Sequence, residues 1–237
     1  MGKQVEVLPD KAGVLARGLE LVMEKIARSI KESGRCTIAL AGGSTPKNLY
    51  EAIAAQSLPW DKIHVFWGDE RYVSPEHPDS NQRMTRLAWL DRVPIPGENI
   101  HPMPTGSGEP GVDAQKHEIE LRQFFGLADG EVPSFDIILL GMGDDGHTAS
   151  LFPHTSALSV SDRLITVGSK DNQPRLTFTV PLINGAKCVI FLVTGAGKRP
   201  AAAQVFAPEG DPQTYPSRLI QPIGELWWLL DQEANPA

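Results

Sequence analysis

A short segment near the middle of the chain combines two carboxylates, an imidazole and three glycines. Residues 141–147 (GMGDDGH) directly follow the apolar run 137–140 (IILL), which is typical of a buried strand. A neutral imidazole at His147 can accept a proton from water near pH 7. Asp145, two residues earlier, can orient the ring or raise its basicity. The pattern indicates general-base activation of water at the carboxyl end of a strand, where open α/β sheets bind ligands.

The same segment is open to other interpretations. It matches the G-x-G-x-x-G spacing of dinucleotide-binding turns, but Asp144 and Asp145 occupy positions where a pyrophosphate needs backbone donors. A zinc site formed by Asp145, His147 and His154 lacks an H-x-x-x-H pair or a cysteine ligand, and no G-x-S-x-G elbow supports a serine nucleophile. The residues favour attack by water on an activated carbonyl, or proton transfer on a sugar.

The segment 41–47 (AGGSTPK) joins the expected strand 36–40 to a helix. Thr45 is expected to cap that helix, with Pro46 in its first turn. The free N–H groups, the hydroxyls of Ser44 and Thr45 and the helix dipole then converge on a spot that suits a phosphate dianion. A simple capped connection is the alternative. Adjacent glycines, which include Gly43, favour phosphate because capping alone does not need them.

Charged residues follow two further predicted strands. The strand 63–67 ends before Asp69 and Arg71, which can line the same crevice or form a solvated turn. The strand 188–193 ends in glycines followed by Lys198 and Arg199 at the start of a helix. A cation there opposes the helix dipole, and an anion bound beside it would explain its position. An exposed helix end is the alternative.

These segments belong to a chain in which strands and helices mostly alternate. A helix is expected over 10–33, another over 112–125, and a little extra β structure around 160–180. The order predicts one doubly wound α/β domain that covers residues 1–237.

Composition limits the classes of function. The chain has 237 residues, a formal net charge of −7 and 41% hydrophobic residues, which fits a globular enzyme and argues against nucleic-acid or membrane partners. The N-terminal stretch has no apolar segment of a signal peptide, so a cytoplasmic location is expected. Cys36 and Cys188 lie in predicted strands and are expected to be reduced and buried.

The motifs together resemble the 6-phosphogluconolactonase family. The matching positions span nearly the whole chain in the right order, and they are AGGSTP at 41–46, WGDER at 67–71, DSN at 79–81, GMGDDGHTASLFP at 141–153, TG at 194–195 with Lys198, and W-x-x-D at 228–231. This family belongs with glucosamine-6-phosphate deaminases and isomerases. The resemblance implies a Rossmann-like, three-layer α/β/α fold with a mostly parallel sheet (NagB/RpiA-like).

The resemblance also implies a reaction. It is the hydrolysis of 6-phospho-D-glucono-1,5-lactone to 6-phosphogluconate, without a cofactor or metal, in the oxidative pentose phosphate pathway. His147 would be the general base and Asp145 its orienter. Arg71 would face the charge of the oxyanion or the phosphate, with Asp69 in support.

By the same resemblance, the phosphate would be held by Gly43, Ser44, Thr45 and Lys198. Arg199 is added as a further phosphate ligand, although the Arg-Pro pair after Lys198 is not a shared feature of the family. The implied partner is a small sugar phosphate lactone, and the protein is expected to be a monomer or small homo-oligomer.

Two alternative functions remain open at this stage. One is an amino-sugar phosphate isomerase or deaminase, in which Asp-Gly-His typically continues into Ile-Ala-Phe-Asn-Glu-Pro. The continuation here is TASLFP over 148–153, without the Asn-Glu pair. The other is a non-catalytic sugar-phosphate sensor, which the joint presence of His147, Asp145 and Arg71 disfavours.

Overall fold

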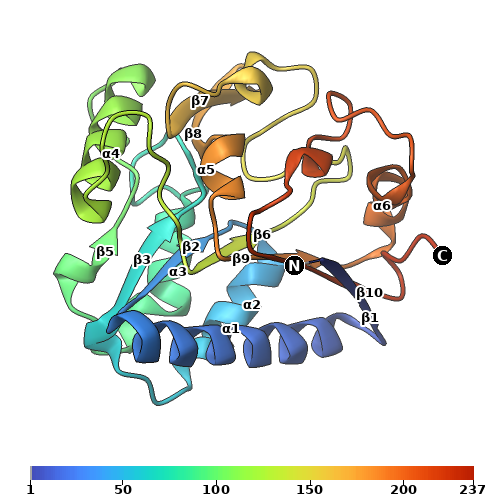
Figure 1. Ribbon diagram of the computed structural model, residues 1–237, viewed down its shortest axis with the longest axis horizontal. Coiled ribbons are helices and arrows are strands. Elements are labelled where there is room, and N and C mark those ends of the chain that lie inside the picture. Colours follow the sequence, from blue (N-terminus) through green and yellow to red (C-terminus); the bar gives the residue numbers. More distant parts are fainter. Residues whose placement is uncertain (1) are drawn as a thin grey trace.

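The computed structural model describes residues 2–237 and is built around a seven-stranded sheet in the order β1-β10-β9-β6-β2-β3-β5 (Figure 1). All neighbouring strands in this sheet are parallel. Its strands are β1 (Lys3–Leu8), β2 (Cys36–Leu40), β3 (Ile63–Trp67), β5 (Ile100–His101), β6 (Ile137–Leu140), β9 (Cys188–Val193) and β10 (Glu225–Asp231).

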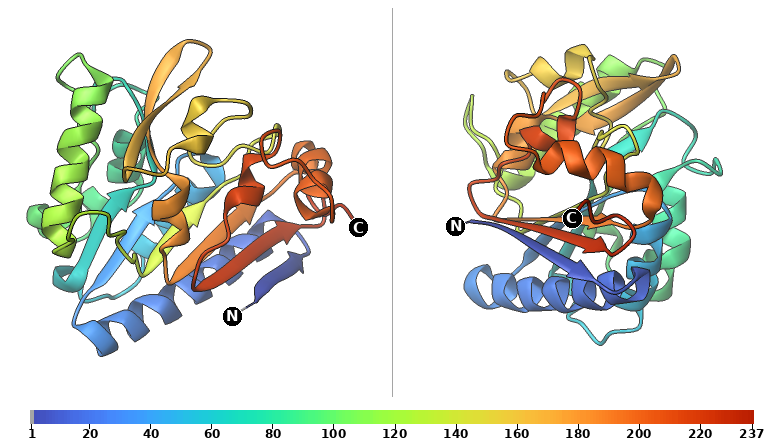
Figure 2. Two further views of the ribbon diagram at one scale, coloured as in Figure 1. Left: turned by 45° about the horizontal axis from the view of Figure 1, so that its top comes forward. Right: turned by 90° about the vertical axis from the view of Figure 1, so that its right-hand side faces the viewer.

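Helices cover both faces of the sheet, which gives three layers (Figures 1 and 2). On one face lie α1 (Lys11–Ser33), α2 (Ser44–Ala54) and α3 (Asn81–Ala88), and on the other lie α4 (Pro110–Phe125), α5 (Val180–Asn184) and α6 (Arg199–Phe206). The expected Rossmann-like, mostly parallel α/β/α fold is therefore confirmed.

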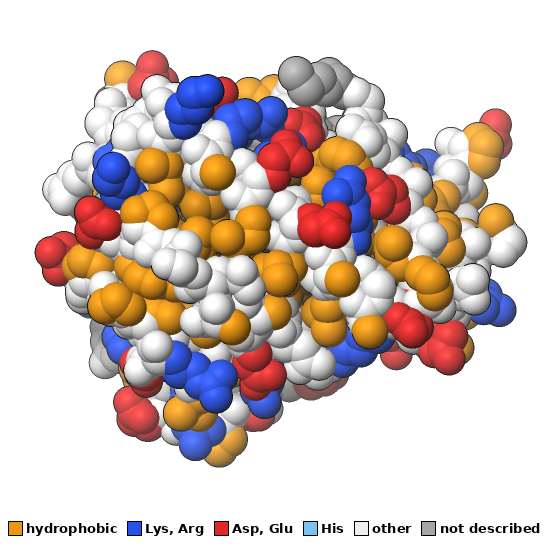
Figure 3. Space-filling view, turned by 90° about the horizontal axis from the view of Figure 1, so that it is seen from below, with side chains coloured by type: hydrophobic (Ala, Val, Ile, Leu, Met, Phe, Trp, Pro, Cys, Tyr) orange, Lys and Arg blue, Asp and Glu red, His pale blue; other side chains and the backbone are white. Residues whose placement is uncertain are grey.

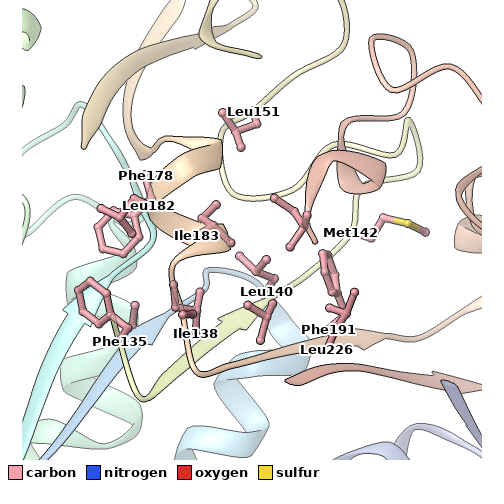
Figure 4. Close-up of a cluster of buried hydrophobic side chains, with 14 of the residues drawn as sticks. Phe135, Ile138, Leu140, Met142, Leu151, Phe178, Leu182, Ile183, Phe191 and Leu226 are labelled. Atoms are coloured by element: carbon pink, nitrogen blue, oxygen red, sulfur yellow. The ribbon is translucent and has the colours of Figure 1, made fainter. Parts of the chain in front are cut away.

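The core lies on both sides of the central strands. In β9, Val189 and Phe191 pack into the cluster drawn in Figure 4, while Ile190 and Leu192 pack into the cluster under α1 and α2. A strand buried on both faces needs apolar residues at every position, because its side chains alternate between two cores. Each such side chain contributes about 1.5–3 kcal/mol by leaving water.

The long helix α1 follows directly from local signals. Asp10 caps it by accepting a hydrogen bond of 2.8 Å from the amide of Gly13, and Gly34 ends it with a left-handed φ of 80°. Its inner face buries Val14, Leu21 and Ile26. The molecule is seen from below, over this helical layer, in Figure 3, where hydrophobic side chains form a broad band with charged side chains around it.

A second, three-stranded antiparallel sheet has the order β4-β8-β7 and consists of β4 (Asp69–Arg71), β7 (Ile165–Lys170) and β8 (Gln173–Phe178). Strands β7 and β8 form a hairpin whose two turn residues, Asp171 and Asn172, have φ values of 52° and 61°. The extra β structure expected around 160–180 is confirmed. The extension of this sheet by β4 was not predicted, because three charged residues give no strand pattern.

Several local predictions were wrong. Strands β1 and β5 were missed. Strand β1 lies at the edge of the sheet and has mostly exposed side chains, and β5 has only two residues. Helix α2 begins at Ser44 with Gly43 as its N-cap, so Thr45 is not the cap. Within residues 2–237, no helix is long and apolar enough to span a membrane.

Candidate active site

A cavity of about 210 Å³ lies where the segments that follow β2, β3, β6 and β9 meet. Since β9, β6, β2 and β3 are neighbours in a parallel sheet, their carboxyl ends open at one edge. The functional groups that line the cavity are Gly43, Asp69, Arg71, His147, Arg175 and Lys198. Five of these six were expected from the sequence, and they come from four distant segments of the chain.

His147 and Asp145 form a close pair at the end of β6. Nδ1 of His147 lies 2.5 Å from Oδ1 of Asp145, and the His147 amide donates to the same oxygen at 3.1 Å. Partial burial alone would raise the pKa of Asp145, but the hydrogen bonds from His147 outweigh it and lower the pKa to about 2. The ionised carboxylate selects the tautomer with a proton on Nδ1, so Nε2 is free to accept a proton. The Phe152 ring packs against the imidazole, 4.5 Å away between centroids.

The glycines of this turn have a steric reason. The amide of Gly143 donates to the His147 carbonyl at 2.8 Å, and a Cβ at Gly143 would collide with His147 Nδ1 and with Asp145 Oδ1. Gly146 has a φ of 78°, and a Cβ there would press on the ring of Tyr215. The glycines therefore make room for the acid–imidazole pair and do not form a dinucleotide fingerprint.

Asp69 is buried beneath the cavity, with 6% of its surface exposed. Its side chain accepts a 2.7 Å hydrogen bond from the Ser150 hydroxyl, and its carbonyl accepts one of 2.9 Å from the Asn81 amide group. The Ser150 hydroxyl thus has a structural partner. Asp69 connects β4 to the segment that follows His147.

Arg71 and Arg175 place two positive charges together in the cavity. They are direct cross-strand partners in β4 and β8. The Nε atoms of both are buried without a hydrogen-bond partner among residues 2–237. Burial and the neighbouring Arg71 charge lower the pKa of Arg175. An anion between them would supply the missing acceptors and offset the repulsion.

Arg175 was not predicted as a site residue. It is a single arginine within a hairpin strand that follows no glycine loop, so its sequence context resembles an ordinary solvated strand. The signal that could have found it is the antiparallel register, which pairs it with Arg71.

The start of α2 lies at the rim of the cavity. Gly43, with a φ of 107°, lines the cavity and is the N-cap, whereas Ser44 and Thr45 form the first turn. First-turn N–H groups have no intrahelical acceptors and carry the positive end of the helix dipole. The Thr45 hydroxyl shares a 2.8 Å hydrogen bond with that of Thr194, which ties the loop after β2 to the loop after β9.

Lys198 reaches the cavity from the loop after β9. Its Nζ lies 2.6 Å from Oδ1 of Asp144, in the turn that carries His147. Asp144 therefore pairs with the lysine, a role that was not predicted from the sequence. The amide of Gly195 donates to Asp231 at 2.9 Å, which fixes the same loop to the end of β10.

Two residues considered from the sequence lie elsewhere. The Arg199 guanidinium donates to the carbonyls of Glu233 at 2.9 Å and Gln232 at 3.1 Å, so it faces the C-terminal segment and does not line the cavity. This geometry does not favour the expected role of Arg199 as a phosphate ligand. His154 is exposed, with Nε2 3.3 Å from the Thr214 hydroxyl, and it does not join Asp145 and His147.

Comparison with known proteins agrees with this arrangement. The family model for glucosamine-6-phosphate isomerases/6-phosphogluconolactonase matches residues 9–228. A 6-phosphogluconolactonase from a Nostoc species is 67% identical, with 99% of this chain and 98% of the relative covered. One from a Synechocystis species is 65% identical over the same shares.

Among solved structures, 6-phosphogluconolactonase from Trypanosoma brucei is 30% identical, with a TM-score of 0.85 and coverage of 98% of this chain and 97% of that one. The family model, which matches residues 9–228, includes every segment that lines the cavity. The chain belongs to the glucosamine-6-phosphate isomerase/6-phosphogluconolactonase family.

Proposed function

We propose that this protein hydrolyses 6-phospho-D-glucono-1,5-lactone to 6-phospho-D-gluconate, the second step of the oxidative pentose phosphate pathway. The observation that carries the proposal is the His147–Asp145 pair, with a carboxylate that stays ionised, in a cavity that also contains Arg71, Arg175 and Lys198. A base for water beside cations for an anionic substrate suits a phosphorylated lactone. Two relatives named 6-phosphogluconolactonase, at 67% and 65% identity, support the assignment.

In the proposed mechanism, Nε2 of His147 removes a proton from water as the oxygen forms a bond to C1 of the lactone. The carbonyl electrons move to the carbonyl oxygen, which gives a tetrahedral oxyanion. When the oxyanion collapses, the bond between C1 and the ring oxygen breaks and the imidazolium returns its proton to that oxygen. Throughout the reaction, the Asp145 carboxylate accepts a hydrogen bond from Nδ1–H of His147 and stabilises the imidazolium. One water is consumed, and no step uses a cofactor or metal.

The cations and the helix terminus would bind the anionic parts of the substrate. We assign Arg71 and Arg175 to negative charge that the lactone carries or develops, because their Nε atoms lack acceptors. Asp69 would have a supporting role, because its carboxylate binds the Ser150 hydroxyl beside the cavity. The phosphate would be held at the rim by Gly43, Ser44, Thr45 and Lys198. Lys198 must exchange Asp144 for phosphate or bridge both, since it pairs with Asp144 at 2.6 Å.

The proposed setting is the cytoplasm, with a free sugar phosphate as the partner molecule. The net charge of −7 supports neither nucleic acid nor an anionic membrane as a partner. A monomer or small homo-oligomer, and a single domain over residues 1–237, remain predictions.

The local structure disfavours amino-sugar chemistry. Thr148 and Ser150 occupy the stretch after His147 where the deaminase-like sequence continues differently. The Thr148 hydroxyl donates to the Gly141 carbonyl at 2.8 Å, and that of Ser150 donates to Asp69 at 2.7 Å. Both hydroxyls are therefore used to hold the loop, and neither supplies an additional acid or base.

A rate comparison tests the proposed function. Lactones hydrolyse spontaneously, so the purified protein is added to freshly formed 6-phosphoglucono-1,5-lactone and acid release is compared with a buffer blank. We expect a rate above the blank that is proportional to enzyme concentration, and no ammonia from glucosamine 6-phosphate. Ammonia release without accelerated lactone hydrolysis would overturn the proposal in favour of a deaminase.

A further inference from the structure

A second and larger cavity of about 780 Å³ lies away from the active site, between β1, the end of α6 and the segment 216–224. It shares no lining residue with the cavity that contains His147. Its walls include Lys3, Phe206, Arg218, Leu226 and Trp228, and among residues 2–237 no aspartate or glutamate lines it. In a chain with a net charge of −7, a cavity with two cations and no acid is a marked local departure.

Arg218 has a structural role that still leaves its charge in place. Its Nη1 donates to the carbonyls of Gln204, Val205 and Ala207 at 2.7–2.8 Å, at the end of α6. These acceptors are neutral backbone groups, so they satisfy the hydrogen bonds without cancelling the positive charge.

Lys3 and Trp228 have donors that the fold does not use. Nζ of Lys3 lies 4.3 Å from the centre of the Phe206 ring and has no ion-pair partner in the described part of the chain. Partial burial and the Arg218 charge lower the pKa of Lys3. Trp228 is 2% exposed, and its Nε1 is buried without an acceptor among residues 2–237. A buried donor without an acceptor costs free energy, which a ligand acceptor would recover.

The remaining wall is apolar. The Trp228 ring stacks on Phe191 with centroids 3.7 Å apart, and the Phe206 ring meets it edge-on at 5.1 Å. Small-molecule sites typically combine such apolar surface with a few convergent polar groups in a volume of roughly 300–1,000 Å³. The polar groups here are donors and cations.

We propose that this cavity is a second binding site, for a small organic anion with a flat apolar body and a phosphate or carboxylate group. The anionic group would lie between Lys3 and Arg218 and would accept a hydrogen bond from Nε1 of Trp228, and the apolar body would lie against Phe206 and Leu226. Such a ligand differs from a sugar phosphate, whose hydroxyls would find no acceptor side chain of Asp or Glu in this cavity.

The cavity wall is also joined to the catalytic turn. Ser217 donates to the carbonyl of Gly146 from its amide at 3.0 Å and from its hydroxyl at 2.8 Å. Gly146 directly precedes His147, so a ligand held by the segment 216–224 would contact a segment that is hydrogen-bonded to the turn that carries the base. The proposed site is therefore separate from the active cavity but attached to it.

The test uses 1-naphthyl phosphate as the anionic probe and 1-naphthol as its neutral counterpart, with the full-length protein. Binding is followed by the five tryptophan indole N–H resonances in a ¹H–¹⁵N spectrum, with that of Trp228 assigned by its loss in Trp228→Phe or, if that variant does not fold, by sequential assignment of the wild type. We expect the naphthyl phosphate to shift the Trp228 resonance, and 1-naphthol to bind more weakly.

Lys3 lies in the edge strand β1, so its substitution carries little risk to folding. Lys3→Met is expected to weaken naphthyl phosphate binding by about tenfold, because a charge-assisted contact is lost. Lys31→Met, an exposed lysine on α1, is the matched control and should bind as the wild type does. An unshifted Trp228 resonance, equal affinity for the two probes, or wild-type affinity in Lys3→Met would each overturn the proposal.

Discussion

Arg71 and Arg175 lie directly opposite each other on β4 and β8, and the Nε of each guanidinium is buried without a hydrogen-bond partner among residues 2–237. Like charges opposite each other destabilise a sheet, and buried donors without acceptors add to that cost. We therefore expect the pair to bind an anion. Both arginines line the cavity that also contains His147.

Removal of one arginine should weaken substrate binding without lowering the stability of the ligand-free protein. Arg175→Leu is expected to raise KM for the lactone and to weaken 6-phosphogluconate binding by about 10–100-fold, the usual range for a charged hydrogen bond. The ligand-free protein should melt no lower than the wild type, because the repulsion with Arg71 is relieved. Enzyme kinetics and thermal melts measure the two effects.

The exposed Arg163, which pairs with Asp162 outside the cavity, supplies the control Arg163→Leu. Its KM should stay at the wild-type value. Unchanged affinity for 6-phosphogluconate in Arg175→Leu would show that Arg175 does not contact the substrate.

The ion pair between Lys198 and Asp144 predicts opposite effects of two substitutions. Lys198→Ala should mainly raise KM, because it removes binding to a group remote from the reacting carbonyl. Asp144→Asn should lower KM by about two- to fivefold, the range expected when an exposed ion pair no longer competes for the lysine. Initial rates over a range of lactone concentrations distinguish the two.

A large loss of kcat with unchanged KM in Lys198→Ala would contradict the phosphate role. An increase of KM in Asp144→Asn would instead mean that Asp144 is needed to position Lys198.

The steric role of Gly143 predicts a selective loss of activity. Gly143→Ala places a methyl group against both members of the His147–Asp145 pair, so kcat should fall at least about tenfold if the pair separates. Gly111→Ala, where a Cβ would meet no atom within 4 Å, is the matched control. Wild-type kcat in Gly143→Ala would show that the close approach of these side chains is not required.

A buried ion pair far from the cavity predicts how stability depends on pH. Burial alone would raise the pKa of Glu225, but hydrogen bonds from Arg28, Lys25 and Trp227 lower it to about 2. A carboxyl group with a lowered folded-state pKa stabilises the protein above its unfolded-state pKa. That contribution is lost as the pH falls toward about 2. We expect the wild type to lose about 2 kcal/mol from this group between pH 5 and pH 2.

Glu225→Gln removes that dependence at a cost near neutral pH. The variant should be less stable at pH 7 by about 3–5 kcal/mol, because Lys25 is left buried without its main partner. Its stability should then decline less steeply in acid than that of the wild type, as measured by urea unfolding at each pH. Parallel curves for the two proteins would refute the assigned role of Glu225.

The sequence was most informative where a functional group is near its partners along the chain. The pair formed by Asp145 and His147 is two residues apart, so the residues alone indicated it. The buried strands were predictable because a parallel sheet covered on both faces needs apolar residues throughout. The loops that follow β2, β6 and β9 could then be placed at one edge.

Features that depend on register or on distant partners were not predictable. Arg175 joins the site only through its pairing with Arg71, and Thr45 is bound by Thr194 instead of capping α2. Lys198 and Arg199 are adjacent cations, yet one lines the cavity and the other faces the C-terminal segment. These outcomes depend on tertiary contacts that no local pattern records.

The most direct test of the proposed mechanism compares His147→Asn with the wild type on 6-phosphoglucono-1,5-lactone, with the spontaneous rate subtracted. His154→Asn, at an exposed histidine outside the cavity, is the control. If His147 is the base, kcat should fall by about 10²–10⁴-fold while the affinity for 6-phosphogluconate stays within a few-fold of the wild type. Near wild-type turnover by His147→Asn would contradict the central claim.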